Sequence, residues 1–220
     1  MCRGKDFCYE LGYVSSYWSK ETLLPRPDWF DSQIDLFVKA VNTFQLGDKD
    51  SCVNIISQIR SDEIIDWYVE HGQMSGRHRA LIIGLEKPQD LPINLRDPER
   101  STKKLDPIVF QRDKYRCRYC GSRLIPTRFI KKFVEELDSP VFRNGRTNQE
   151  RHGIIHLTKP VADHVVPWRL GGRTNIENLV SSCPPCNYGK DGYTLEQLGL
   201  DDPFSRPNEG CDWIYQTSFL

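Results

Sequence analysis

The residues best suited to catalysis lie close together toward the C-terminal end of the sequence. Asp163 and His164 are neighbours, and Asn178 and Asn187 follow within 25 residues. A neutral imidazole can take a proton from water near neutral pH. Carboxylate and amide oxygens are the ligands that a hard cation such as Mg²⁺ prefers. An Asp-His dipeptide is ordinary by itself, but these four residues together indicate metal-assisted hydrolysis by an activated water.

Two Cys-x-x-Cys pairs accompany these residues, and the spacing inside each pair is typical of zinc ligands. Four thiolates would complete a closed tetrahedral site, which stabilises a fold but leaves no position for a catalytic water. The sequence therefore predicts one structural zinc ion per chain, bound by Cys117, Cys120, Cys183 and Cys186. The other cysteines lack this spacing and are expected to be buried or unreactive thiols: Cys2, Cys8, Cys52 and Cys211.

Local patterns predict the elements that must hold the four motif residues. Residues 161–166 are apolar and β-branched enough to form a strand that delivers the histidine. Residues 167–173 form a turn-rich crossing, and residues 179–181 can return as a second strand. Proline is tolerated in the first turn of a helix, so the Pro-Pro pair that follows favours a helix with Asn187 and Lys190 on one side.

The order of these parts over residues 105–198 resembles the HNH (ββα-metal) nuclease family. The resemblance implies that His164 is the general base that activates water. It also implies that Asp163 and Asn187 bind Mg²⁺ or another divalent cation, and that Asn178 orders the loop and supports the base. An asparagine at the last of these positions matches the His-Asn-Asn variant of the family, and a double cysteine knuckle is frequent among its members.

Charge is distributed unevenly along a chain whose formal net charge is zero. Residues 100–190 contain 18 Lys and Arg against 8 Asp and Glu, whereas both flanks are acidic. A basic segment that coincides with the motif suits a polyanionic substrate. Three basic side chains of this segment are expected to contact phosphates around the cleaved bond: Lys190, Arg169 and Arg173.

The pattern predicts an α+β protein in two parts. Apolar residues at helical spacing indicate four short helices within residues 1–99, which we expect to form a small, mostly α-helical domain. Prolines make residues 86–104 a linker. Residues 105–220 would form the C-terminal ββα-metal nuclease domain with its structural zinc site, and residues 121–160 would be an insertion that forms a helix followed by a polar loop.

The resemblance to HNH nucleases implies a metal-dependent endonuclease that cuts DNA, in restriction, phage defence or a mobile element. Two alternatives stay open: an RNA-cleaving toxin with the same site, and a zinc-stabilised nucleic-acid-binding module that does not turn over. The N-terminal helices would choose the target or bind a protein partner. No apolar run approaches the ~20 residues of a bilayer span, and the N-terminus lacks an apolar signal stretch. We therefore expect a cytoplasmic protein without a membrane partner.

Overall fold

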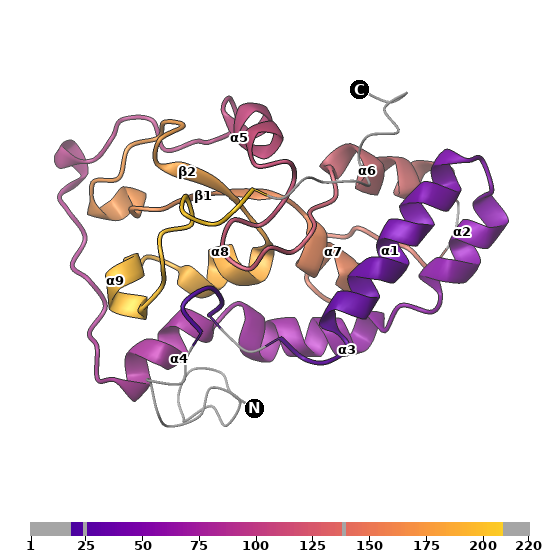
Figure 1. The fold of residues 1–220 in the computed structure, drawn as a ribbon, viewed down its shortest axis with the longest axis horizontal. Coiled ribbons are helices and arrows are strands. Elements are labelled where there is room, and N and C mark those ends of the chain that lie inside the picture. Colours follow the sequence, from indigo (N-terminus) through magenta and orange to yellow (C-terminus); the bar gives the residue numbers. More distant parts are fainter. Residues whose placement is uncertain (1–18, 24–25, 138–139, 209–220) are drawn as a thin grey trace.

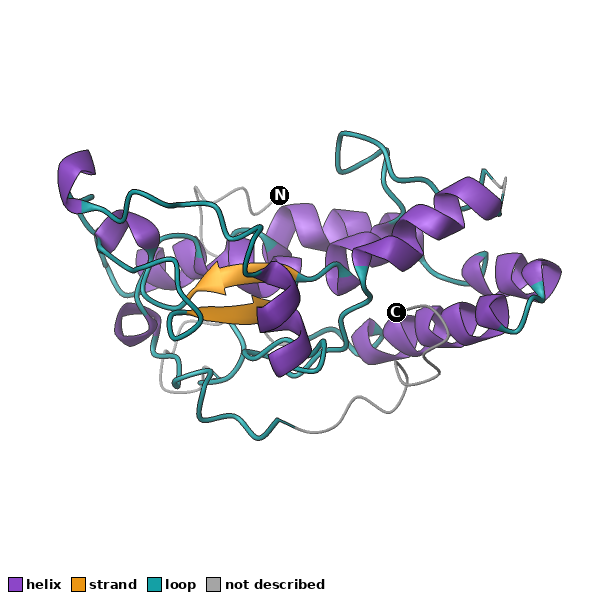
Figure 2. Ribbon diagram, turned by 90° about the horizontal axis from the view of Figure 1, so that it is seen from above, coloured by secondary structure: helices purple, strands orange, loops and turns teal. Residues whose placement is uncertain are grey.

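The computed structural model describes residues 19–23, 26–137 and 140–208. An antiparallel sheet of two strands, β1 (Val161–His164) and β2 (Leu179–Ser182), lies near the middle of the molecule (Figure 1). Figure 2, turned by 90°, shows helices on both sides of this small sheet and loops around its open end. Three cysteines lie outside the described residues: Cys2, Cys8 and Cys211.

The N-terminal region is helical, as the sequence predicts. Its helices are α1 (Phe30–Gln45), α2 (Lys49–Ile56), α3 (Ser61–Trp67), which continues as a π-helical turn (Tyr68–Gly72), and α4 (Ser75–Ile82). The cap of α2 is Asp48, whose carboxylate accepts from the backbone N–H of Ser51 at 3.0 Å. Among the described helices, none is both long and apolar enough to cross a bilayer.

The C-terminal half contains the sheet and shorter helices. These are α5 (Asp106–Arg112), α6 (Thr127–Glu136), α7 (Gly153–Thr158), α8 (Pro184–Lys190) and α9 (Leu195–Leu198), with 3-10 turns at Ile93–Leu95 and Trp168–Leu170. The two strands and α8 appear where the sequence predicts them. The fold class is therefore α+β, with a helical N-terminal region and a strand–strand–helix unit near the C-terminus.

The main hydrophobic core crosses the boundary that the sequence suggested. Phe37 of α1 packs edge-on against Phe133 of α6, with ring centroids 5.7 Å apart, and it stacks on Phe142 at 5.8 Å. Cys52 of α2 and Ile154 of α7 are buried in the same core. Residues 121–160 are therefore packed against the N-terminal helices, and only the stretch around residues 143–151 keeps the expected character of a polar, exposed loop.

Helix α7 was not predicted, because its start lacks the usual capping residues. The cap is His152, whose ring nitrogen accepts from the N–H of Ile154 at 3.4 Å. His156, one turn further on, is buried and stacks on Tyr68 with centroids 4.6 Å apart. Both histidines are thus part of the core, and the ring of His156 packs against Tyr68.

The N-terminal helices also support α8 directly. Gly76 of α4 and Gly189 of α8 lie so close that a Cβ at Gly76 would be 2.2 Å from the Gly189 carbonyl oxygen. A Cβ at Gly189 would be 2.3 Å from the hydroxyl of Ser75. Only glycine allows this approach, so the position of α8 is set by α4 as well as by its own strand.

The predicted linker is docked onto the loop between the strands, and we call residues 88–101 the strap. The Leu91 N–H donates to the Arg169 carbonyl at 2.9 Å, and the Trp168 indole N–H donates to the Asp97 carbonyl at 2.9 Å. The Arg169 guanidinium reaches the Asp90 carboxylate at 2.5 Å. The strap therefore follows the loop that connects β1 to β2 instead of running free.

The core histidines predict a stability that falls in acid. Burial, and then the charge of His156, lower the pKa of His152 from 6.5 to about 4. The unfolded chain takes up a proton below pH 6.5 while the folded one stays neutral, so stability present above pH 6.5 is lost as the pH falls toward 4. The full loss is up to about 3 kcal/mol. His152→Asn keeps a capping oxygen and should make urea-unfolding free energies less dependent on pH between 7 and 4.5 than in the wild type. Equal slopes would contradict this assignment.

Candidate active site

Four buried cysteine sulfurs meet at one point beside α8. The Sγ atoms of Cys117, Cys120, Cys183 and Cys186 all lie within 4.8 Å of one another. The sulfurs of Cys120 and Cys183 are 3.7 Å apart, which matches the ~3.8 Å expected between ligands of a tetrahedral site with Zn–S bonds of ~2.3 Å. No disulfide joins them. The cluster that the sequence predicts is therefore assembled, with the geometry of a closed zinc site.

Local backbone structure explains why these sulfurs converge. The first pair lies on a tight hairpin in which Arg116 bridges to Arg123, and the turn is closed by Gly121, whose N–H donates to the Cys117 carbonyl at 2.8 Å. Gly121 has φ +75°, a conformation that favours glycine. The second pair lies at the start of α8, where Cys183 is the residue before the first turn.

The chemistry of the four donors fits a divalent cation. Burial raises the pKa of the Cys183 thiol well above its usual range, so a thiolate at this depth requires a positive partner. Zn²⁺ would supply that charge and would tie the hairpin to the start of α8. Four cysteine sulfurs would fill all four ligand positions of the ion, which is typical of a structural zinc site rather than a catalytic one.

Asp163 lies in β1 opposite Val180, and its side chain is held from two directions. The Tyr119 hydroxyl donates to Asp163 Oδ2 at 2.7 Å, and the Lys190 ammonium lies 3.3 Å from the same oxygen. Burial and the adjacent carboxylate raise the pKa of Tyr119 well above its usual range, so the hydroxyl keeps its proton and donates. Tyr119 belongs to the first cysteine pair, so the metal cluster and Asp163 are directly connected.

His164 is the last residue of β1. Its Nε2 lies 2.9 Å from the hydroxyl of Thr174 in the loop between the strands. Partial burial, and the nearby ammonium of Lys190, lower the pKa of the imidazole, against the opposing charge of Asp163. The ring is therefore neutral at pH 7, the state in which an imidazole can accept a proton.

Asn178 binds the backbone of the loop that follows His164. Its Oδ1 accepts from the Val166 N–H at 2.8 Å, and its Nδ2 donates to the carbonyls of Val166 at 3.0 Å and Arg173 at 2.9 Å. Gly172 lies against this contact so closely that a Cβ there would be 1.8 Å from the Val166 carbonyl. The amide thus holds the loop at both of its ends.

Asn187 lies in α8 on the side of the helix that carries Lys190 one turn later. That side faces Asp163, because the Lys190 ammonium contacts both the Asp163 carboxylate and the His164 carbonyl, the latter at 2.9 Å. Asp163 Oδ1 and the Asn187 amide make no hydrogen bond with any residue that the structure describes. Two oxygens of the kind that Mg²⁺ prefers are thus left on facing elements.

The three predicted phosphate contacts lie in different environments. Lys190 is 1% exposed and is committed to Asp163 and His164, so its ammonium does not face solvent. Arg169 is tied to Asp90 of the strap and to the Gly192 carbonyl at 2.9 Å. Arg173 is exposed. Of the three, only Arg173 has a position from which a phosphate could be reached directly.

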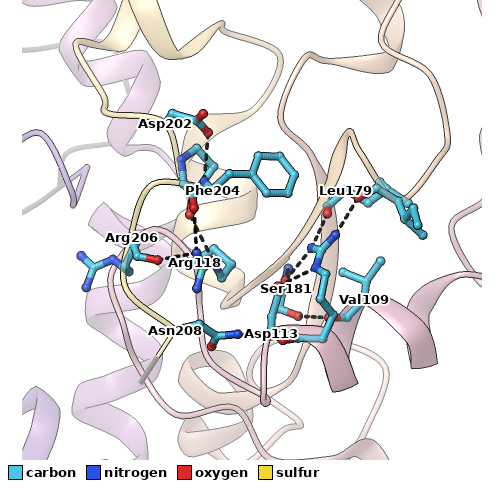
Figure 3. A network of polar contacts seen from close by, with 12 residues as sticks. Val109, Asp113, Arg118, Leu179, Ser181, Asp202, Phe204, Arg206 and Asn208 are labelled. Atoms are coloured by element: carbon cyan, nitrogen blue, oxygen red, sulfur yellow. Dashed lines mark hydrogen bonds and ion pairs between the residues drawn. The ribbon is translucent and has the colours of Figure 1, made fainter. Parts of the chain in front are cut away.

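Other arginines of the basic segment also hold the fold together. Figure 3 shows Arg118 beneath the segment 202–208, where its guanidinium donates to the carbonyls of Pro203 at 3.1 Å and Phe204 at 3.2 Å. Asp113 of the same network accepts from the Ser181 N–H at 2.7 Å. A count of positive charges therefore overstates the surface that is free to meet a polyanion. The exposed basic residues of the segment are Arg100, Lys103, Lys104, Arg128, Lys131, Arg143, Arg146, Lys159 and Arg173.

Sequence reasoning did not single out Tyr119 or Thr174. Tyr119 lies between the two cysteines of the first Cys-x-x-Cys pair. That place was the only signal for it in the sequence, since two flanking metal ligands fix the position of the residue between them. Thr174 carried no signal of its own. Its contact with His164 depends on a loop conformation and on the strap, and both are set by residues far away in the sequence.

The cysteine cluster predicts a specific effect of substitution. Cys183→Ser should lose about one zinc ion per chain in metal analysis of the purified protein, and should unfold more readily, because the remaining donors no longer close the site. Cys52→Ser is the matched control, since Cys52 is also fully buried but lies outside the cluster. It should lose stability while keeping its zinc. Unchanged zinc content in Cys183→Ser would refute the ligand set.

A comparison with protein families agrees with this geometry. Residues 150–191 match the model of the HNH endonuclease family. The matched segment contains both strands, the loop and α8, together with the second cysteine pair. No curated protein and no solved structure matches the chain. The chain thus carries an HNH endonuclease domain, supported by a cysteine cluster suited to zinc.

Proposed function

We propose that this protein is a metal-dependent endonuclease that hydrolyses phosphodiester bonds in DNA, with His164 as the general base. The observation that carries the proposal is the position of His164 at the end of β1, inside the segment that matches the HNH family. HNH nucleases act on nucleic acid and use divalent metals. Our proposal adds three assignments to this family match: the general base, the metal ion and the substrate.

The role of His164 follows from its protonation state. Hydrolysis needs a nucleophile at neutral pH, and an imidazole with a depressed pKa can take a proton from water without first losing one of its own. Partial burial supports that state in His164. Asn178 fixes the loop behind the ring through Val166, so the histidine has a defined position from which to act.

Asp163 and Asn187 would hold the divalent cation, and Mg²⁺ suits their oxygens. The metal would supply positive charge at the phosphate and the leaving oxygen. Tyr119 and Lys190 engage one oxygen of Asp163, which leaves the other for a cation. Only two protein ligands are proposed, so the ion would keep most of its waters and several divalent metals should serve.

The basic charge around the site supports a polyanionic substrate, and DNA is the nucleic acid that we propose. Arg173 and the other exposed basic side chains of residues 100–146 would provide the phosphate contacts. We place the protein in the cytoplasm, in restriction, phage defence or the biology of a mobile element. The helices before residue 99 would choose the target or bind a protein partner. We propose this separate role although these helices share a hydrophobic core with α6 and α7.

Cleavage assays with purified protein test the assignment. Supercoiled plasmid, linear duplex DNA and structured RNA would each be incubated with Mg²⁺ or with EDTA. The wild type should cleave DNA with Mg²⁺ alone, and His164→Ala should lower the rate at least ~100-fold, the usual contribution of a general base. Zinc content and unfolding free energy, measured on the same samples, control for loss of structure.

Each alternative has its own result in that assay. Cleavage of RNA but not DNA would support the toxin. Tight binding of DNA without cleavage under any metal would support a module that does not turn over. Plasmid cleavage that is equally fast in His164→Ala would remove His164 from the role of base.

The pH dependence gives a second test. Because the pKa of His164 lies below the 6.5 of an ordinary histidine, the neutral form persists into mild acid. The kcat/KM of the wild type at saturating Mg²⁺ should be flat around pH 7 and should fall only below pH 6.5, as the base becomes protonated. A profile that is still rising steeply between pH 7 and 8 would contradict a histidine base with a depressed pKa.

A further inference from the structure

The hydroxyl of Thr174 connects His164 to the strap. Thr174 Oγ1 lies 2.9 Å from His164 Nε2 and 2.5 Å from the carbonyl oxygen of Glu99. A carbonyl oxygen can only accept a hydrogen bond, so the single hydroxyl proton of Thr174 points to Glu99. Thr174 Oγ1 must then accept from His164, which requires a proton on Nε2. In the neutral ring this leaves the lone pair on Nδ1.

The strap fixes Thr174 at its backbone as well. The Thr174 N–H donates to Asp97 Oδ2 at 2.9 Å, and Asp97 Oδ1 accepts from the Glu99 N–H at 2.9 Å. One carboxylate therefore joins the loop to the strap and also shapes the turn that presents the Glu99 carbonyl. These two hydrogen bonds lower the pKa of Asp97, so the carboxylate is ionised at neutral pH.

Trp168, in the loop between the strands, also binds this stretch of the strap. Its indole N–H donates to the Asp97 carbonyl at 2.9 Å. Two guanidinium groups lie close to its ring, that of Arg96 at 5.1 Å and that of Arg100 at 5.2 Å from the ring centroid. The tryptophan is thus occupied by the strap, which gives the strap a defined place over the loop.

We infer that Thr174 is a positioning residue for His164, and that the strap segment from Asp97 to Glu99 determines which ring nitrogen of His164 is free. This inference rests on the proposed function for its effect on cleavage. The strap holds Thr174, Thr174 holds Nε2–H, and Nδ1 is left as the basic nitrogen. The opposite tautomer would direct the lone pair into Thr174, where no water could be activated.

The arrangement gives the strap a role in the reaction without contact with the substrate. The strap connects α4 to α5, and α4 packs on α8 through Gly76 and Gly189. A change in the N-terminal helices could therefore reach the His164 ring through residues 88–101. Sequence alone marked this stretch as a linker because of its prolines.

Two substitutions at one position test the inference in the full-length protein. Thr174→Val keeps the shape of the side chain but removes the hydroxyl, whereas Thr174→Ser keeps the hydroxyl. Thr174→Val should lower kcat for plasmid cleavage about 10–100-fold, the usual cost of removing a group that orients a reacting residue, with KM and zinc content unchanged. Thr174→Ser should restore kcat to within about threefold of the wild type, since the second hydrogen bond is re-formed.

The ring nitrogens of His164 can be measured without any cleavage. The ¹⁵N chemical shifts of the ring, assigned by comparison with His164→Ala and recorded above the pH at which the ring is protonated, report which nitrogen carries the proton. The wild type and Thr174→Ser should show the Nε2–H form. Thr174→Val should show a mixture of the two tautomers, because the acceptor for Nε2–H is gone.

The outcomes separate the inference from the proposed function. An Nδ1–H ring in the wild type would overturn the inference, and so would an unchanged tautomer together with unchanged kcat in Thr174→Val. If His164→Ala cleaves as well as the wild type while the ¹⁵N shifts behave as expected, the proposed function fails and the positioning by the strap stands.

Discussion

Four buried sulfurs arranged to bind one cation are the constraint on which the rest of this structure depends. Two of them come from a hairpin and two from the start of α8, so a single ion would join segments separated by 62 residues in the sequence. The same hairpin carries Tyr119, which holds Asp163, and α8 carries Lys190 and Asn187. A two-stranded sheet buries too little surface to fix these side chains by itself. The cysteine cluster therefore stabilises the strand–strand–helix unit, as a larger hydrophobic core would in another protein.

The helices around this unit add a second level of restraint. Gly76 against Gly189 sets α8 against α4, and the strap crosses the loop that follows His164. The proposed active site is thus enclosed by segments that precede it in the chain. This agrees with a core shared between α1 and α6, because helices that had to move freely would not bury their aromatic side chains in one another. The N-terminal region is part of the support of the site as well as a candidate for target choice.

The parts that the sequence predicts are those with local signals. Cys-x-x-Cys spacing, the Asp-His pair and the Pro-Pro start of α8 each depend on neighbouring residues, and the zinc cluster and strand–strand–helix unit appear where expected. Helix α7 was not predicted, because its cap is a histidine, which is not a usual capping residue. The burial of Lys190, the pairing of Arg169 and the docking of the strap depend on contacts between distant segments, which no local pattern encodes. The sequence shows the net positive charge of the segment but not which of its arginines bind backbone carbonyls of the fold, as Arg118 and Arg169 do.

A crystal structure of the protein soaked with Mn²⁺, a scatterer that can replace Mg²⁺, tests the whole account most directly. Anomalous maps should show one zinc peak bonded to the four cysteine sulfurs at ~2.3 Å, and one manganese peak in contact with the Asp163 carboxylate and the Asn187 amide oxygen. A manganese ion bound elsewhere, or Asp163 and Asn187 too far apart to share one, would contradict the account.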